Sequence, residues 1–378
     1  MTRVLIASAA YGGQNVGDDA ILAAMVGHLR AQCSDIQITA VTREPVEMAE
    51  RLGIKTLEFI GVANRVQTYR AISRMDAVIV GGGALIAEYT KGWKGLVTGH
   101  PGYPMTMLAV AQLLRKKTMV YGAGVEKIES PAARFLVRHF FGRADLITLR
   151  DEDSHLRLVN DLGIDSTRVV TTADPVLGLE VPSPLEMDKI AHDLGLDDDP
   201  RPLAVINFAY GIDRRPELLD FIAQSADYLI SKCEARVLFI PMNIQATTDR
   251  AGMELVHERM RHPESAQILP LPYAHREVIS IVRRADMVLS SRMHLLIFAA
   301  LVSTPILGIS RVPKVDAFLD HYGMSAGAST QHLDFAEFQR VLEHAWSTRS
   351  EIRARLEAER IRMGEIARSN AKYFEEIL

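Results

Sequence analysis

The sequence Met287-Val288-Leu289-Ser290-Ser291-Arg292-Met293-His294-Leu295-Leu296-Ile297-Phe298-Ala299-Ala300 predicts the repeating unit of the fold, a short buried strand that runs directly into a helix. Residues 287–289 are typical of the strand, and the apolar run after His294 is typical of the helix. Ser291, Arg292 and His294 lie at the junction, where free N–H groups and the positive end of the helix favour an anion. We expect Arg292 and His294 to bind a phosphorylated substrate there. The alternative is a capped core helix whose Arg292 pairs with a carboxylate.

The same pattern of a strand followed by a helix recurs along the whole chain. In the first half, β-branched and aliphatic runs predict strands at residues 4–8, 36–41, 77–80, 118–121, 146–149 and 169–171. In the second half they predict strands at residues 203–207, 236–240, 267–269, 287–289 and 305–309. Amphipathic segments such as 20–32 and 132–141 separate them. This alternation indicates βαβ units, so we predict an α/β fold of two Rossmann-like, doubly wound parallel-sheet domains.

A change in composition separates the two halves. Four prolines between residues 182 and 202, together with the acidic run 197–199, predict a linker somewhere between residues 179 and 202. We place the first domain at residues 1–180 and the second at residues 181–345. Residues 346–378 are charged and nearly free of helix breakers, so we expect a C-terminal helix that packs back on the first domain.

Length and composition exclude several classes of protein. The chain has 378 residues, 48% hydrophobic and 24% charged, which suits two globular domains. With a net charge of −4 the chain lacks the excess of positive charge that is typical of nucleic-acid-binding proteins, so we expect no nucleic-acid partner. The histidines and the two cysteines, Cys33 and Cys233, lack the spacing of metal ligands. Without a signal peptide or a membrane-length apolar run, we expect a cytoplasmic protein with at most peripheral contact at the inner face of the membrane.

Two loops of the first half follow predicted strands and contain glycines. One includes Asn15 and Asp18, and the other is the run Gly81-Gly82-Gly83. Glycines allow a backbone to approach a ligand closely, whereas Asn15, Asp18 or Asp19 could simply cap the helix that follows. Neither loop matches G-x-G-x-x-G or has the lysine of a nucleotide P-loop, so we do not expect a dinucleotide site.

Basic residues follow other predicted strands. Arg150 ends one of them, and its fork suits a carboxylate or phosphate, although it could instead pair with Asp151 or Asp153. Arg311 and Lys314 follow the last strand, where they could add positive charge beside Arg292 or be solvated.

Taken together in chain order, these loops resemble the polysaccharide pyruvyl transferase family. The resemblance spans about residues 5–320, and the ordered set is more specific than any one motif. The motifs are Tyr11-Gly12 with Asn15-x-Gly17-Asp18-x-Ala20-Ile21-Leu22, Gly81-Gly82-Gly83-x-Leu85, Tyr121-Gly122-x-Gly124, Arg150-Asp151-x-x-Ser154, Ala173-Asp174-Pro175, and Arg292-x-His294-x-x-x-Phe298-Ala299 followed by Pro313-Lys314-Val315.

The resemblance implies a GT-B-like arrangement of the two domains and a transferase that uses phosphoenolpyruvate as its donor substrate. Such an enzyme moves the enolpyruvyl-derived group onto a hydroxyl pair of a sugar, in a polysaccharide or its precursor, and forms a pyruvate ketal. Arg292 and His294 match the donor-binding Arg-x-His of the family, and Arg150 matches a further donor-binding arginine. No cofactor is expected, and the chemistry requires no metal.

From these matches we assign expected roles. His294 is the acid or a phosphate ligand, and Asp18 is a base or an acceptor contact, on the acceptor side in the first domain. The other expected substrate-binding residues are Arg150, Arg292, Ser291, Lys314, Asn15, Gly82 and Gly83. We expect Arg150 and Arg292 to face one donor between the domains. The expected partners are phosphoenolpyruvate and a sugar acceptor, free or lipid-linked, and homo-oligomerisation stays open.

Two alternatives remain at this point. One is a GT-B glycosyltransferase that uses a nucleotide sugar, which would need a nucleobase and ribose site in the second domain. The other is a non-catalytic binding protein on the same scaffold, suggested by residues that depart from the usual family pattern, such as Glu88 and Arg311.

Overall fold

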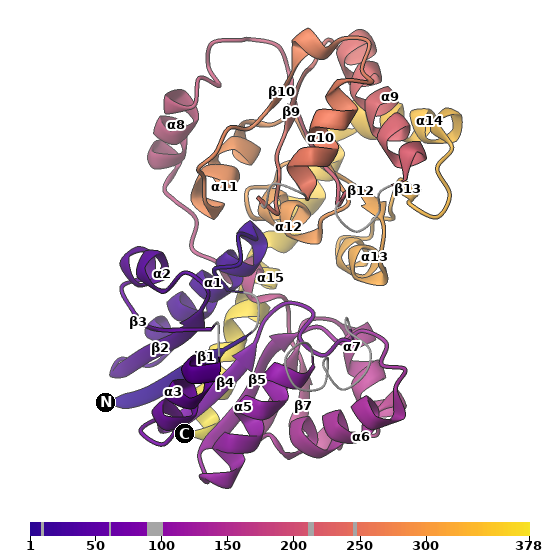
Figure 1. Cartoon of the computed structure of the whole chain (residues 1–378). Helices are drawn as coiled ribbons and strands as arrows, with labels where there is room; N and C mark the ends of the chain where they lie inside the picture. The colour runs from indigo at the N-terminus through magenta and orange to yellow at the C-terminus, as the bar shows by residue number, and fades with distance from the viewer. Residues whose placement is uncertain (9–10, 60–61, 89–100, 211–214, 245–247) are drawn as a thin grey trace. The chain divides into compact units, whose positions relative to one another are not determined.

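Each half of the chain builds its own parallel sheet in the computed structural model (Figure 1). The structure describes residues 1–8, 11–59, 62–88, 101–210, 215–244 and 248–378. Contacts divide the chain into a first unit, Met1–Glu180 with Met363–Leu378, and a second unit, Val181–Arg362. The predicted fold class, α/β with two doubly wound parallel sheets, is confirmed.

The first unit contains a seven-stranded sheet in the order β3-β2-β1-β4-β5-β6-β7. Its order reverses between β1 and β4, which is where ligands bind in sheets of this kind. β3 lacks an apolar run and was not predicted, because it is a partly exposed edge strand. The strands are β1 (Thr2–Ala7), β2 (Ile36–Thr42), β3 (Lys55–Glu58), β4 (Ala77–Gly81), β5 (Lys117–Ala123), β6 (Leu146–Leu149) and β7 (Val169–Thr171).

The second unit contains a six-stranded sheet in the order β10-β9-β8-β11-β12-β13, with its reversal between β8 and β11. The two-residue edge strand β13 was not predicted either. The strands are β8 (Leu203–Asn207), β9 (Arg236–Phe239), β10 (Ala266–Ile268), β11 (Met287–Ser290), β12 (Ile306–Ser310) and β13 (Ala328–Ser329).

Helices cover the faces of both sheets (Figure 1). In the first unit they are α1 (Val16–Gln32), α2 (Pro45–Leu52), α3 (Val62–Ile72), α5 (Gly102–Leu113), α6 (Pro131–Phe140) and α7 (Glu152–Leu156). In the second they are α8 (Pro184–Asp193), α9 (Pro216–Cys233), α10 (Asp249–His257), α11 (His275–Arg284), α12 (Met293–Leu301), α13 (Pro313–Asp320) and α14 (Phe335–Ser347). No helix in the described part of the chain combines the length and the apolarity that crossing a bilayer requires.

The segment 179–202, within which we expected a linker, holds the boundary between the units at Glu180, and it also holds the helix α8. Pro184 is the first helical residue, where proline is tolerated, and Ser183 before it and Glu186 after it form a capping box. The Asp188 carboxylate of α8 pairs with Arg283 of α11 at 2.5 Å. Pro184 therefore starts a helix that packs within the second unit.

The last helix, α15 (Arg349–Ile377), contributes to both units. Residues up to Arg362 cluster with the second unit, so this unit extends past the expected boundary at residue 345. In the first unit, the buried Asn370 side chain accepts hydrogen bonds from the hydroxyls of Thr148 and Thr172 and donates one to the Ala173 carbonyl at 3.4 Å. These bonds attach the end of α15 to the last strands of the first sheet.

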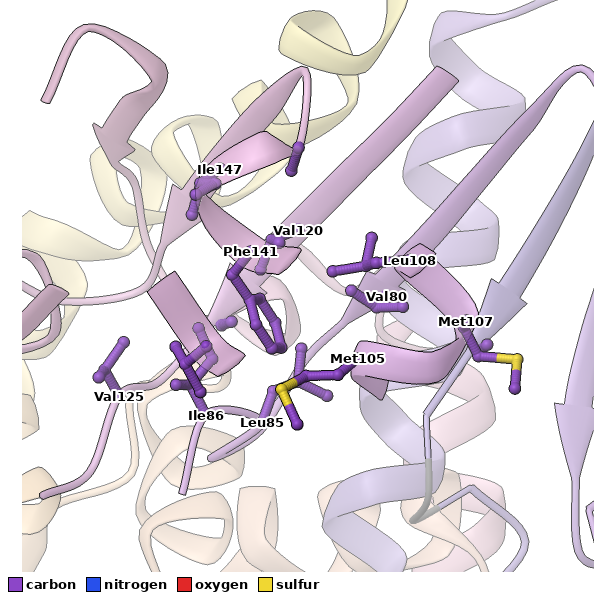
Figure 2. Close-up of a cluster of buried hydrophobic side chains, with 14 of the residues drawn as sticks. Val80, Leu85, Ile86, Met105, Met107, Leu108, Val120, Val125, Phe141 and Ile147 are labelled. Atoms are coloured by element: carbon purple, nitrogen blue, oxygen red, sulfur yellow. The ribbon is translucent and has the colours of Figure 1, made fainter. Parts of the chain in front are cut away.

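A continuous apolar core fills the space between the first sheet and α5 (Figure 2). Val80, Val120 and Ile147 come from neighbouring strands, Leu108 comes from α5, and Phe141 follows α6. All five side chains are completely buried. Burial of each such side chain contributes about 1.5–3 kcal/mol, so this layer is a main source of stability for the first unit.

We predict that Phe141→Ala lowers the free energy of unfolding by about 3–5 kcal/mol, because it leaves a cavity in this core. Urea unfolding followed by circular dichroism would measure the change. Phe135→Ala on α6 is the matched control: this ring is exposed, so its loss should change stability by about 0.5 kcal/mol or less. Equal effects of the two substitutions would contradict the assignment of the core.

Candidate functional site

The predicted functional residues lie in loops at the carboxyl ends of the strands in both sheets. In the second unit, the relevant loops follow β8, β9, β11 and β12. In the first unit they follow β1, β4 and β6. Because parallel strands all end at the same edge, side chains distant in sequence meet there.

Two serines shape the turn between β11 and α12. The Ser290 hydroxyl accepts a hydrogen bond from the Arg292 N–H at 3.0 Å and donates one to the Arg292 carbonyl at 3.1 Å. The Ser291 hydroxyl accepts one from the Ala209 N–H at 3.0 Å, in the loop after β8. Ser291, predicted to bind substrate, thus joins the two loops at the reversal of strand order.

Arg292 is the residue before the first turn of α12, and its guanidinium forms a two-point ion pair with Asp249. Its Nε donates to Oδ2 at 3.1 Å, and its Nη2 donates to Oδ1 at 2.5 Å. The Arg292 side chain is 19% exposed, whereas that of Asp249 is completely buried. Arg292 thus has the carboxylate partner that the alternative interpretation expected. The pair uses the Nε–Nη2 edge of the guanidinium, and among the described residues no hydrogen bond from Nη1 occupies the other edge, which suits an anion.

Asp249 and Asn207 are two residues of this site that the sequence did not identify. Besides Arg292, the Asp249 carboxylate accepts hydrogen bonds from the N–H groups of Met242 at 3.2 Å and Asn243 at 3.0 Å. Asn207, the last residue of β8, donates to Asp249 at 3.4 Å and to the Ile240 carbonyl at 2.7 Å. A polar residue that ends an otherwise apolar strand was the only sequence signal for Asn207.

His294 and Lys314 are the other predicted residues of the second unit. His294 is partly buried in the first turn of α12, and Lys314 is partly buried in the first turn of α13. α12 follows β11 and α13 follows β12, and these two strands pair directly, with Ser290 opposite Gly308. The fold therefore brings Ser291, His294, Lys314 and Arg292 to one edge of the second sheet.

In the first unit, the loop after β1 is held by its own polar side chains. Asn15 caps α1, because its side chain accepts a hydrogen bond from the Gly17 N–H at 3.1 Å. The Asp19 carboxylate accepts one from the Gly12 N–H at 2.7 Å. Asp18 is partly buried, and its Oδ1 lies 3.7 Å from the position that a Cβ on Gly83 would take. Asp18 therefore lies against the glycine loop that follows β4.

Gly82 and Gly83 have positive φ angles of 74° and 64°, which disfavour other residues. A Cβ on Gly82 would lie 2.1 Å from Ile21 Cγ2 of α1. The Gly82 N–H donates to the Tyr121 carbonyl at 2.8 Å, and the Gly83 carbonyl accepts from the Gly124 N–H at 2.7 Å. The close approach that these glycines allow is thus to α1 and to β5.

Three of the quoted motifs meet at Arg150, whose side chain is only 4% exposed. Its Nε donates to Asp151 at 3.2 Å, as the alternative expected, and its Nη1 donates to Asp174 at 3.4 Å rather than to Asp153. The guanidinium also lies against Gly124, where a Cβ would be 2.6 Å from Nη2. Two carboxylates therefore hold this arginine in a fixed orientation.

Arg150 and the glycine loops belong to the first unit, and the Arg292 junction belongs to the second. That both arginines contact one donor stays a prediction. Within the described ranges, no group of three or more histidine, cysteine, aspartate or glutamate side chains is arranged to hold a metal ion.

Comparison of the structure with solved structures identifies the fold class. It resembles UDP-GlcNAc 2-epimerase from Neisseria meningitidis bound to UDP-GlcNAc, with 13% identity, a TM-score of 0.68 and 99% of each chain covered. It also resembles a glycosyltransferase from Rickettsia africae, with 10% identity, a TM-score of 0.66, and 100% of this chain and 98% of that chain covered. At these identities the likeness concerns the fold alone, which is of the GT-B class.

The sequence itself identifies the family. The family model described as polysaccharide pyruvyl transferase matches residues 15–311, and the chain belongs to this family. A sequence comparison with curated proteins found no match. The predicted resemblance is therefore confirmed, and the protein is assigned to a family of transferases that modify polysaccharides.

Burial shifts the pKa values of two α1 side chains in opposite directions. It raises the pKa of the Asp19 carboxyl to about 6, against the effect of its hydrogen bond from Gly12. It lowers the pKa of His28, whose Nδ1 lies 3.3 Å from the Tyr121 hydroxyl, to about 4. Both shifts follow from the cost of a charge in the interior.

We predict that these two groups offset each other in the acid stability of the first unit. Between pH 6.5 and 4 the unfolded chain binds a proton at His28 that the folded chain does not, so stability falls as pH falls, by about 3 kcal/mol in total. Between pH 6 and 4 the folded chain keeps a proton on Asp19 that the unfolded chain releases, so this group makes stability rise as pH falls, by a similar amount.

Urea unfolding at a series of pH values tests both signs. Relative to the unmodified chain, His28→Gln should gain stability as pH falls from 6.5 to 4, and Asp19→Asn should lose it. Parallel pH profiles for the three proteins would show that neither group titrates with the shifted pKa.

Proposed function

We propose that the protein transfers the enolpyruvyl-derived group of phosphoenolpyruvate onto two hydroxyls of a sugar and forms a pyruvate ketal. Family membership supports a pyruvyl transferase, and the observation that most directly supports the donor is the Arg292 junction. There an oriented guanidinium stands at the start of α12, with His294 in the first turn. Phosphoenolpyruvate presents a phosphate and a carboxylate, and both match this chemistry.

The donor is proposed to bind at the carboxyl edge of the second sheet. The free edge of the Arg292 fork and the first N–H groups of α12 would contact one anionic group. Lys314, at the start of the neighbouring α13, would add positive charge. Ser291 would hold the junction against the loop after β8 through its bond from Ala209. Phosphoenolpyruvate is here a substrate, and no cofactor is proposed.

The proposed reaction converts the methylene of the donor into the methyl group of the ketal. An acid donates a proton to the methylene carbon, and positive charge develops at the central carbon, where a sugar hydroxyl adds. Phosphate then leaves, a second hydroxyl closes the ring, and both hydroxyl protons are released. We propose that His294 is this acid or a ligand of the phosphate, since an imidazole exchanges protons near neutral pH.

The first unit is proposed to contribute the acceptor side. Asp18, beside Gly83, would accept a proton from a sugar hydroxyl or bind it, and Asn15 and Gly82 would shape that loop. Arg150 is proposed as a further donor contact. The acceptor, free or lipid-linked, and a cytoplasmic location at the inner face of the membrane belong to the same proposal.

We predict that His294→Ala and Arg292→Lys each lower phosphoenolpyruvate-dependent phosphate release by about 100-fold or more with a panel of sugar acceptors. Lysine keeps the positive charge but lacks the planar guanidinium that donates two hydrogen bonds to one anion. It is preferable to alanine, which would leave the buried Asp249 without its partner. Circular dichroism should be unchanged. His344→Ala and Arg355→Lys, at exposed positions of the same unit, are the controls. Full activity of either site variant would refute the proposed roles.

We further predict that Asp249 positions Arg292. Asp249→Asn keeps the shape of the side chain but removes the charge that orients the guanidinium, so the KM for phosphoenolpyruvate should rise about tenfold while kcat changes less. Steady-state phosphate release measures both constants. Asp316→Asn on α13 is the control, because it makes the same change from carboxylate to amide at a residue that accepts a hydrogen bond from Ser310. An unchanged KM with a stable fold would refute the positioning role.

A further inference from the structure

The first unit has a basic pocket at the edge of its sheet opposite to the functional loops. The pocket has a volume of about 600 Å³ and is lined by Leu113, Arg115, Lys116, Lys117, Phe140 and Arg143 among others. Lys117 is the first residue of β5, whereas Asp18 and Arg150 follow the carboxyl ends of strands. The pocket therefore lies apart from the proposed site.

Positive charge is in excess around this pocket. Arg115, Lys117 and Arg143 are exposed, and within the described part of the chain none of them forms an ion pair. One carboxylate, Asp145, also lines the pocket, so its four cations outnumber its acids. Asp145 accepts hydrogen bonds from the Thr118 N–H at 2.8 Å and hydroxyl at 2.9 Å, and Asp76 pairs with Arg3 at 3.0 Å. The pocket can thus accept an external anion.

Two leucines beside the cations project into solvent at the end of α5. Leu113 is 82% exposed and lines the pocket, and Leu114, the next residue, is 40% exposed. Exposed leucines beside a group of unpaired cations match the boundary between headgroups and acyl chains of a bilayer. An acidic protein surface would satisfy the cations, but it would not account for two exposed leucines, one lining the hollow and one next to it in sequence.

We propose that this edge of the first unit docks on a bilayer that contains anionic phospholipid. A headgroup phosphate occupies the pocket of Arg115, Lys116, Lys117 and Arg143, and Leu113 and Leu114 enter the acyl boundary. Because the amino and carboxyl ends of the strands lie at opposite edges, the loops of Asp18 and Arg150 face away from the bilayer. This inference does not depend on the proposed reaction.

The test is co-sedimentation of the full chain with vesicles of phosphatidylcholine alone or mixed with phosphatidylglycerol. We expect binding to the mixed vesicles only, and its loss at high salt. Arg115→Gln with Lys117→Gln should weaken binding about 25-fold, from about fivefold per charge. Leu113→Ser should weaken it about tenfold while the salt dependence stays the same. Arg353→Gln with Arg355→Gln, exposed cations of the second unit, should leave binding unchanged.

Three results would overturn the proposal. One is equal binding to both kinds of vesicle, and another is mixed-vesicle binding that the pocket variants do not weaken. The third is mixed-vesicle binding that Leu113→Ser does not weaken, because the leucine would then not enter the acyl boundary. Phosphate release with a soluble acceptor should be the same for the pocket variants and the unmodified chain, so a failed docking result leaves the proposed reaction untouched.

Discussion

The buried ion pair between Asp249 and Arg292 is the interaction on which the proposed site of the second unit depends. A carboxylate with no exposed surface must be compensated, and removal of its partner would cost about 3–5 kcal/mol. Arg292, Asn207 and two backbone N–H groups supply that compensation. The same bonds join the loops after β8, β9 and β11, so the guanidinium is oriented before any ligand arrives. Preorganisation of this kind reduces the entropic cost of binding an anion.

The first unit uses the same principle with different residues. Arg150 is held by Asp151 and Asp174, and each carboxylate also caps a helix, through the N–H groups of Ser154 and Val176. The guanidinium can lie flat against the chain only because Gly124 has no side chain. In both units, therefore, an arginine at the carboxyl edge of a parallel sheet is fixed by a carboxylate from another loop, Asp174 for Arg150 and Asp249 for Arg292.

Local patterns predicted most of the fold. The aliphatic runs located every strand except β3 and β13, because these edge strands are partly exposed and lack a continuous apolar run. Prolines between residues 182 and 202 suggested a linker in that segment; the boundary between the units falls at its start, at Glu180, whereas Pro184 begins α8. The ordered motifs indicated the family correctly, and they included Arg150, Arg292 and His294. They did not include Asp249 and Asn207, because these two residues belong to the site only through hydrogen bonds that form between separate loops.

The sequence by itself determined the alternation of strands and helices, the two sheets and the family, because strand and helix signals depend on residues that are neighbours in the chain. The tertiary structure decided which charges pair. Arg292 and Asp249 are 43 residues apart, and Arg150 and Asp174 are 24 apart. No local pattern encodes such pairs, since they form only when the order of parallel strands brings separate loops to one edge. The same folding brings the turn after α5 to the opposite edge, where Leu113 and the cations after it remain exposed.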